Sequence, residues 1–437
     1  MNNGFLKILP AGIVRKLSFF LLIYLQTPCM QAQSDSLSEA RECRIRKGLP
    51  NFFQKLQTGQ SVTIAYLGGS ITAAANGWRE GSASWLQKQY PAATIKSIDA
   101  AIGGTGSDFG IFRLRKQVLE LNPDLIFIEF AVNDGEMSPE LIHETMEGIV
   151  RQTWKYNANT DICFVYTLAA TMLAPMEKGR LPVSSRAMED IAQHYGIPSV
   201  SMGMEVAALA LSGELIFKGE LDEYPGKMVF SPDNVHPYAE TGHRLYTEAL
   251  SRSLQTIAGN RSNIRVAHKL IKPFTPNNWE EAQLISIATL QTSGSWKILE
   301  SADDSVARLM PKTLSYLAKS TEPGSTIRAK FKGRMIGLFD IIGPGCGQYL
   351  VTLDSEKPIL YPRFDPYSTY YQPQPLFIPI PDLKQKVHTI EFKVSTVRPD
   401  KEAILKEINN KIDNPERYKE NACYAGQLML IGQIINK

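Results

Sequence analysis

The sequence predicts two domains, an α/β domain built on a parallel sheet and then an antiparallel β sandwich of the jelly-roll type. The chain has 437 residues, which exceeds the usual size of one domain. Its first half alternates strand-like and helix-like stretches, whereas its second half consists of short strand-like runs separated by turn residues. An apolar fraction of 43% and a charged fraction of 21% are ordinary for globular proteins, so most of the chain is expected to fold.

The N-terminal stretch predicts a secretory signal peptide at residues 1–32. Three basic residues precede the apolar run "LSFFLLIYLQ", and "TPCMQAQ" offers small residues for cleavage. The apolar run is short for a membrane span, so we expect export to the bacterial periplasm or medium, with no stable membrane insertion after the signal is removed. An uncleaved anchor helix is the alternative. Pro28 disfavours lipoprotein processing at Cys29.

The charge balance gives no reason to expect a nucleic-acid partner. Removing the signal takes Lys and Arg from 47 to 44, against 44 Asp and Glu, so the mature chain is formally neutral. A neutral chain lacks the basic surface that nucleic acid or an anionic membrane attracts. The remaining cysteines are too sparse for a disulfide framework or a zinc cluster, although one bridge is chemically allowed outside the cytoplasm. They are Cys43, Cys163, Cys346 and Cys423.

The α/β domain is predicted at residues 61–258, after an N-terminal lead-in at 33–60. Its strand-like runs are "VTIAYL", "ATIKSIDAAI", "DLIFIEFAV", "DICFVYTL" and "IPSVSM". Strands that are apolar on both faces and alternate with helices indicate a parallel sheet covered on both sides. The helical stretches carry apolar stripes, namely Ile111, Leu114, Val118 and Leu121 in one and Ile142, Met146 and Ile149 in another.

The sandwich domain is predicted at residues 278–437, after a linker at 259–277. Its short runs include "STIRAKFKGRMIGLFDII", "GQYLVTLDS", "PLFIPIP" and "KVHTIEFKVS", with clusters of Gly, Pro, Asp and Ser between them. This spacing is typical of an antiparallel sandwich.

Polar residues follow the strands of the α/β domain, and their side chains suit acyl transfer. "GGSIT" carries Ser70, "AIGGTGSD" carries Gly104 and "FAVND" carries Asn133, each at the end of a strand-like run. Much later, just before the last helix, "SPDNVHPYAETGHRL" carries Asp233 and His236. The carboxyl ends of parallel strands meet in one crevice. A serine there needs an imidazole to accept its proton and a carboxylate to orient the imidazole, while backbone N–H groups at glycine turns and a neutral amide can stabilise an oxyanion. Each motif alone is more often a turn or a helix cap, so the prediction depends on their joint occurrence.

These motifs resemble those of the SGNH, or GDSL-like, hydrolase family, which has a three-layer flavodoxin-like fold. The resemblance covers residues 60–257 and implies a triad of Ser70, His236 and Asp233. It also implies an oxyanion hole made by Ser70, Gly104 and Asn133. No metal or organic cofactor is implied.

Two positions depart from the pattern of the family without removing a catalytic group. Gly69 stands where many members have Asp, and Ala131 and Val132 stand where many have a glycine before the Asn. The Gly-Gly-Ser version is familiar among exported bacterial members that carry an added sandwich domain.

Further residues are candidates for substrate binding. Trp78 is predicted to line the acyl or sugar pocket, with ordinary packing as the alternative. Tyr367 and Tyr371 lie in the aromatic stretch "YPRFDPYSTYYQPQP" and are predicted either to face a glycan or to pack between the domains. Asp134 is expected to cap the helix that begins near Pro139 or to stabilise a turn of its loop, with a hydrogen bond within the site as the alternative.

The sequence therefore predicts an exported ester hydrolase that removes acetyl or other short acyl groups from a polysaccharide or oligosaccharide. The expected partner is an acylated glycan. A glycan-binding protein with a vestigial hydrolase domain, and a lipase or thioesterase of the same fold, are the alternatives. The sequence predicts no oligomeric state.

Overall fold

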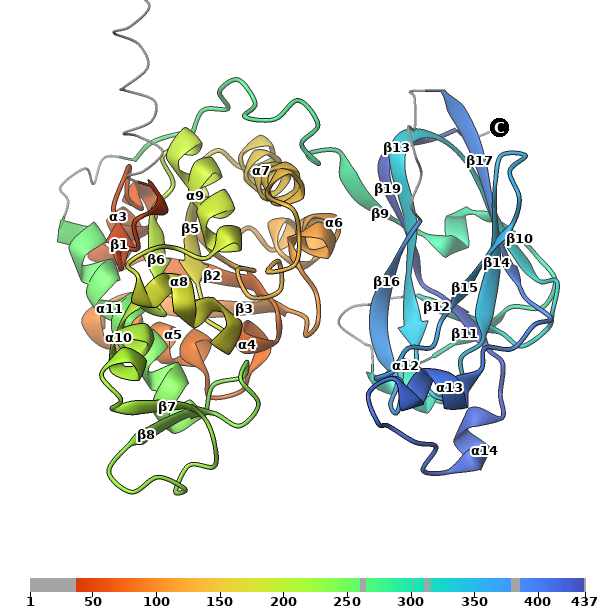
Figure 1. Cartoon of the computed structure of the whole chain (residues 1–437). Helices are drawn as coiled ribbons and strands as arrows, with labels where there is room; N and C mark the ends of the chain where they lie inside the picture. Colours follow the sequence, from red (N-terminus) through yellow and green to blue (C-terminus); the bar gives the residue numbers. More distant parts are fainter. Residues whose placement is uncertain are drawn as a thin grey trace, which may run out of the picture.

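The computed structural model describes residues 37–259, 265–300, 302–309, 314, 316–378 and 386–435. An α/β domain and a β domain lie side by side (Figure 1). The signal peptide predicted at residues 1–32 lies outside the described residues. Within the described part of the chain, no helix is long and apolar enough to cross a membrane.

A six-stranded sheet forms the centre of the α/β domain, in the order β1-β6-β5-β4-β2-β3. Neighbouring strands are parallel except for β1, which runs antiparallel to β6 at the edge. The parallel sheet expected from the sequence is confirmed. Its strands are β1 (Cys43–Arg44), β2 (Ser61–Gly68), β3 (Thr94–Ala101), β4 (Leu125–Glu129), β5 (Asp161–Tyr166) and β6 (Ser199–Ser201).

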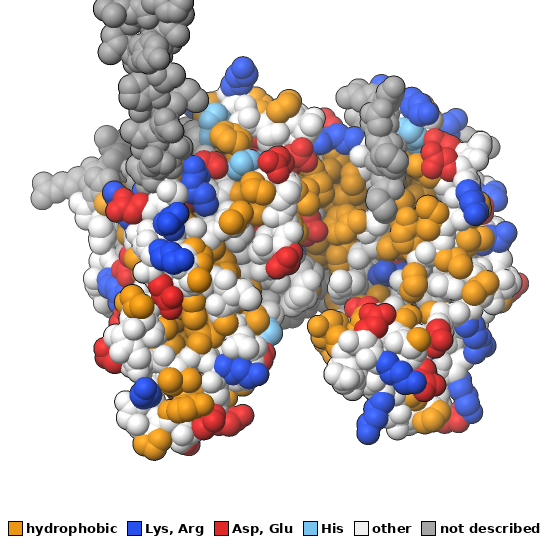
Figure 2. Space-filling view, viewed as in Figure 1, with side chains coloured by type: hydrophobic (Ala, Val, Ile, Leu, Met, Phe, Trp, Pro, Cys, Tyr) orange, Lys and Arg blue, Asp and Glu red, His pale blue; other side chains and the backbone are white. Residues whose placement is uncertain are grey.

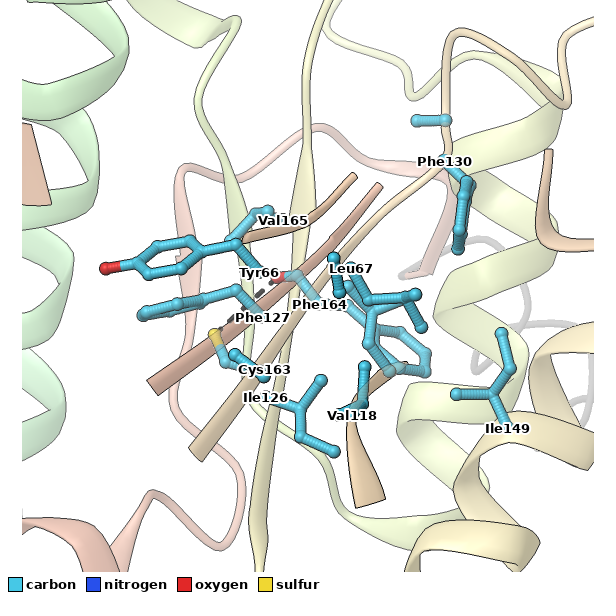
Figure 3. Close-up of a cluster of buried hydrophobic side chains, with 14 of the residues drawn as sticks. Tyr66, Leu67, Val118, Ile126, Phe127, Phe130, Ile149, Cys163, Phe164 and Val165 are labelled. Carbon is cyan, nitrogen blue, oxygen red and sulfur yellow. Dashed lines mark hydrogen bonds between the residues drawn. The ribbon is translucent and has the colours of Figure 1, made fainter. Parts of the chain in front are cut away.

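Helices cover both faces of this sheet because the central strands are apolar on both sides. Figure 3 shows Tyr66 and Phe127 on one side of the strands and Leu67 on the other. Helices α5 (Trp78–Gln89) and α11 (Arg244–Gly259) pack together over the first face, and α6 (Ser107–Gln117), α7 (Pro139–Tyr156) and α9 (Val183–Tyr195) pack over the second. Shorter helices are α3 (Pro50–Gln57), α4 (Ser70–Ala73), α8 (Leu173–Glu177) and α10 (Met204–Leu211).

The apolar stripes predicted from the sequence are buried, with one exception. The stripe of α7 is completely buried, as are Ile111 and Leu114 on α6 and Val118 directly after its end. Leu121 is 53% exposed because α6 ends at Gln117 and a short 3₁₀ turn follows.

The C-terminal domain is an antiparallel β sandwich, as predicted. Its larger sheet has the order β15-β14-β17-β13-β19-β9, with β10 and β16 also paired to the long strand β13. A smaller sheet has the order β11-β12-β18. The strands are β9 (Ala282–Ser286), β10 (Gln291–Ser293), β11 (Lys297–Leu299), β12 (Leu317–Ser320), β13 (Thr326–Ile342), β14 (Gln348–Leu353), β15 (Ile359–Pro362), β16 (Gln372–Ile378), β17 (Val387–Val394), β18 (Cys423–Ala425) and β19 (Gln427–Ile434). The short helices of this domain are α12 (Ser305–Leu309), α13 (Lys401–Lys406) and α14 (Pro415–Tyr418).

The segment between the domains is bound along the α/β domain. The carboxylate of Glu147 on α7 accepts hydrogen bonds from the N–H groups of Phe274 (2.6 Å) and Thr275 (2.7 Å). Upstream, the His268 ring stacks on Trp154 with 4.7 Å between centroids. The residues of the predicted linker that the structure describes are therefore anchored rather than free.

The domains share a packed apolar contact through α6. The ring of Phe109 lies 4.4 Å from that of Phe339 on β13, and Phe112 packs against Trp279 and Phe377. Because α6 follows the loop that carries Gly104, this contact supports the helix next to the candidate site.

Candidate active site

The turn after β2 brings Ser70 to the carboxyl edge of the sheet. Gly68 ends the strand, and Gly69 precedes α4, which begins at Ser70. A Cβ on Gly68 would lie 2.5 Å from Oγ1 of Thr72, and a Cβ on Gly69 would lie 2.0 Å from Oδ1 of Asn133. Both distances are below any van der Waals contact, so the turn leaves no room for a side chain before the serine.

Ser70, His236 and Asp233 form a continuous hydrogen-bond chain. The Nε2 atom of His236 lies 2.8 Å from Oγ of Ser70, and its Nδ1 atom lies 2.7 Å from Oδ2 of Asp233. This geometry fits the tautomer in which Nδ1 carries the proton and Nε2 accepts one from the serine. The side chains of His236 and Asp233 are each half exposed, so a substrate can reach them.

The loop after β8 orients this pair. The parallel strands β7 (Leu215–Lys218) and β8 (Met228–Ser231) lead into the loop, and the π-helical turn η3 (Ala239–His243) and α11 follow it. Oδ1 of Asp233 accepts hydrogen bonds from the backbone N–H of His236 (2.8 Å) and of Val235 (3.0 Å), and from the hydroxyl of Ser231 (3.0 Å).

The pKa of Asp233 lies well below its ordinary value. Burial alone would raise this pKa, but hydrogen bonds from the His236 ring and from the backbone N–H groups of His236 and Val235 outweigh burial. Asp233 is therefore ionised at neutral pH, which is the state that orients the imidazole and stabilises its protonated form.

Gly104 and Asn133 lie beside the serine turn. A Cβ on Gly103 would lie 3.6 Å from Cβ of Ser70, which places the loop after β3 against the serine. Gly104 has φ +70° and open space where a side chain would be. Because the Asn133 amide lies directly against Gly69, the three loops that follow β2, β3 and β4 meet at one point, as predicted.

The three candidates for substrate binding lie in different surroundings. Trp78 does not line the site, because its side chain is completely buried between Tyr66 and Phe127. The prediction of a pocket-lining role is therefore wrong in this structure, and the packing alternative holds. Tyr371 is partly buried against Tyr424, whereas Tyr367 is 60% exposed, so a contact with substrate remains a prediction for both tyrosines.

Sequence reasoning missed two buried charged residues that hold the strand ends. Glu129 ends β4 and accepts hydrogen bonds from the hydroxyls of Thr72 (2.8 Å) and Thr167 (2.6 Å). Burial raises the pKa of Glu129, and these hydroxyls and the N–H of Gly69 oppose the rise. Arg113 on α6 donates hydrogen bonds to the carbonyls of Gly68 and Ala100. A single charge inside an apolar run, as in "LIFIEFAV", was the available signal for Glu129.

The described residues contain no metal cluster and no disulfide. No group of three or more His, Cys, Asp or Glu side chains in the described ranges could hold a metal ion. The four cysteines of the described chain are thiols; Cys163, Cys346 and Cys423 are buried, and Cys43 is partly buried.

Comparisons with known proteins agree with this fold. Residues 66–245 match the model of the GDSL-like Lipase/Acylhydrolase family. Two crystal structures of a two-domain esterase (CEX) active on acetylated mannans are similar at 19% sequence identity. The TM-score is 0.69 for one of them and 0.68 for the other, which is co-crystallized with mannopentaose. These matches cover 90% of this chain and 97% and 98% of the other chains, respectively. A comparison with curated proteins found no match.

The likeness to the two-domain esterase extends over both domains and shows the fold. The family match covers the part of the chain that carries Ser70, Gly104, Asn133, Asp233 and His236. Over residues 66–245, the α/β domain of this chain thus matches the GDSL-like Lipase/Acylhydrolase family, in agreement with the resemblance to SGNH hydrolases.

Proposed function

We propose that this chain is an exported serine ester hydrolase that removes acetyl or other short acyl groups from a polysaccharide or oligosaccharide. The observation that carries the proposal is the hydrogen-bond chain from Asp233 through His236 to Ser70. The family of the α/β domain supports ester hydrolysis, and the signal-like pattern at residues 1–32 supports export. The similar two-domain esterase acts on acetylated mannans, which makes acetylated mannan the first substrate to test.

The first half of the reaction forms an acyl-enzyme. Oγ of Ser70 attacks the ester carbonyl carbon while Nε2 of His236 takes the hydroxyl proton. The N–H groups of Ser70 and Gly104 and the amide of Asn133 donate to the oxyanion that forms. His236 then gives its proton to the leaving sugar oxygen as the bond between the carbonyl carbon and that oxygen breaks, which frees the sugar hydroxyl.

The second half releases the acyl group. Water attacks the acyl carbon and loses a proton to His236, and the tetrahedral intermediate collapses with return of that proton to Oγ of Ser70. The product is the free acid, such as acetic acid. These steps need no metal or organic cofactor.

Replacing Ser70 tests the proposal directly. Ser70→Ala should lower kcat by more than about a thousand-fold, because no other group takes the place of the nucleophile. Asn133→Ala should lower kcat by about a hundred- to a thousand-fold, because one oxyanion donor is lost. The measurement is acetate release from acetylated mannan and acetylated xylan by the mature protein, beside hydrolysis of short- and long-chain nitrophenyl esters. A thermal melt of each variant controls for folding.

Three results would contradict the proposal. Full activity of Ser70→Ala would refute the assignment of the nucleophile. Saturable binding of a glycan without turnover would favour a glycan-binding protein. A strong preference for long-chain esters would favour a lipase or thioesterase.

A further inference from the structure

The three loops at the site come from different strands, so hydrogen bonds between the loops must set their separations. The N–H of Ile102 donates to the carbonyl of Gly68 at 3.1 Å and joins the loop after β3 to the serine turn. A second connection joins the loop after β3 to the loop that carries Asn133. Asp134 supplies this connection.

The carboxylate of Asp134 bridges the two loops that carry the oxyanion donors. The residue is completely buried, and its Oδ1 atom accepts a hydrogen bond from the backbone N–H of Ser107 at 2.9 Å. Ser107 begins α6, three residues after Gly104, and Asp134 directly follows Asn133. A Cβ on Gly106 would lie 2.4 Å from the same Oδ1 atom, so the loop admits the carboxylate only because residue 106 is glycine.

This bond differs from the helix cap that the sequence predicted for Asp134 and agrees with the alternative of a hydrogen bond within the site. The hydroxyl of Ser138 caps α7, where it accepts the N–H of Leu141 at 3.3 Å. Helix α6 has a carboxylate of its own in its first turn, because Asp108 accepts the N–H of Phe109 at 2.7 Å. The first turn of α6 thus already has an acceptor in Asp108. The hydrogen bond to Asp134 therefore serves in addition to connect the two loops.

We propose that Asp134 is a positioning residue that sets the separation between the Gly104 N–H and the Asn133 amide. This inference rests on the proposed function, because both groups act there as oxyanion donors. Asp134 touches no reacting atom and acts through Asn133 and Gly104. Donors misplaced by about 1 Å lose much of their effect, so the link bears on kcat more than on substrate binding.

A double-mutant cycle with Asn133 tests the inference. Asp134→Ala should lower kcat for nitrophenyl acetate by roughly 10- to 100-fold with KM within about twofold. In a protein that already carries Asn133→Ala, adding Asp134→Ala should lower kcat by less than about threefold, because the donor that Asp134 positions is already gone. Asp134→Asn keeps an oxygen that accepts the Ser107 N–H, and it should stay within about threefold of the unaltered protein.

Asp108→Ala is the matched control, since it removes a neighbouring carboxylate from the same helix turn without breaking the link between the loops. Its effect on kcat should be less than about threefold and independent of Asn133. Two outcomes would overturn the inference and leave Asp134 a purely structural residue. One is an equal loss of kcat in Asp108→Ala and Asp134→Ala. The other is a double variant of Asp134→Ala and Asn133→Ala whose loss of kcat is the product of the two single losses.

The crystal structure of Asp134→Ala gives a readout that does not need activity. We expect residues 102–107 to lie farther from Asn133 than in the unaltered protein, and an unmoved loop would overturn the inference. Failure of the proposed function is recognised separately, because Ser70→Ala would then hydrolyse the ester as fast as the unaltered protein.

Discussion

Gly69 is the residue at which the serine turn and the Asn133 amide come closest. Its φ of −94° suits any residue, so the space around it and not the backbone demands glycine. A Cβ there would meet Oδ1 of Asn133 at 2.0 Å and its Nδ2 at 3.0 Å. Gly69→Ala should therefore push the amide away and lower kcat by about 10- to 100-fold, with little change in the free energy of unfolding.

Gly103→Ala is the comparison for this prediction. Its Cβ would lie 3.6 Å from Cβ of Ser70, an ordinary contact, so this change should lower kcat much less than Gly69→Ala does. Steady-state kinetics and a thermal melt of both variants make the measurement. Equal kcat values for the two variants would show that the Asn133 amide moves aside without loss.

The sequence predicted Ser70 as the nucleophile because it follows a strand, and strand ends of a parallel sheet meet at one edge. It predicted Asp233 and His236 from their spacing and their place just before the last helix, and they follow β8, which pairs with β7 outside the six-stranded sheet. The charge inside "LIFIEFAV" was a signal for a buried Glu129, but the hydrogen-bond partners of Glu129 and Arg113 could not be predicted, because they come from other segments such as those of Thr167 and Ala100. The pocket-lining role predicted for Trp78 was wrong because closeness to Ser70 in sequence does not tell which face of the sheet a helix covers. Tyr66 and Phe127 bury the indole there.

Two carboxylates lie at the start of α6, the partly buried Asp108 in its first turn and the buried Asp134 from the loop after β4, and they make the stability of the protein depend on pH. Burial raises the pKa of Asp108 to about 6 and that of Asp134 to about 7, although N–H donors oppose both rises. Asp108 and Glu129 also raise the pKa of Asp134. In the unfolded chain an Asp titrates near pH 3.9. The folded protein therefore holds more protons between about pH 4 and pH 7, and it loses stability as pH rises through that window.

Asp134→Asn should remove part of this dependence. The difference in the free energy of unfolding, Asp134→Asn minus the unaltered protein, should rise by up to a few kcal/mol between about pH 4 and pH 7. Above that range the difference should stay constant. Urea unfolding of both proteins at several pH values measures the difference. A difference that stays flat across the window would show that Asp134 is already ionised at pH 4.

The sequence predicted the strands of the α/β domain well, because strands buried on both faces give continuous apolar runs. It treated residues 33–60 as a lead-in, whereas β1 and α3 in this segment belong to the α/β domain. The two residues of β1 are too few to show a pattern. The sequence also did not predict that the linker is bound to α7, because its partner Glu147 lies more than a hundred residues upstream of Phe274 and Thr275.

At the scale of the whole molecule, the two domains are expected to unfold together. Buried side chains from both domains form one continuous cluster, which includes Phe109 and Phe112 of α6 and Phe339 of β13. The linker is bound to α7 through Glu147. A large apolar contact between domains couples their unfolding, because losing one domain exposes the buried surface of the other.

Calorimetry of the protein without residues 1–32 should therefore show a single unfolding transition. Phe339→Ala removes the ring that packs on Phe109, so it should lower Tm and separate the transition into two. Phe331→Ala removes an equally buried ring from the interior of the sandwich, away from α6, and should lower Tm while the transition stays single. Two transitions in the unaltered protein, or equal splitting in both variants, would mean that the contact at α6 does not couple the domains.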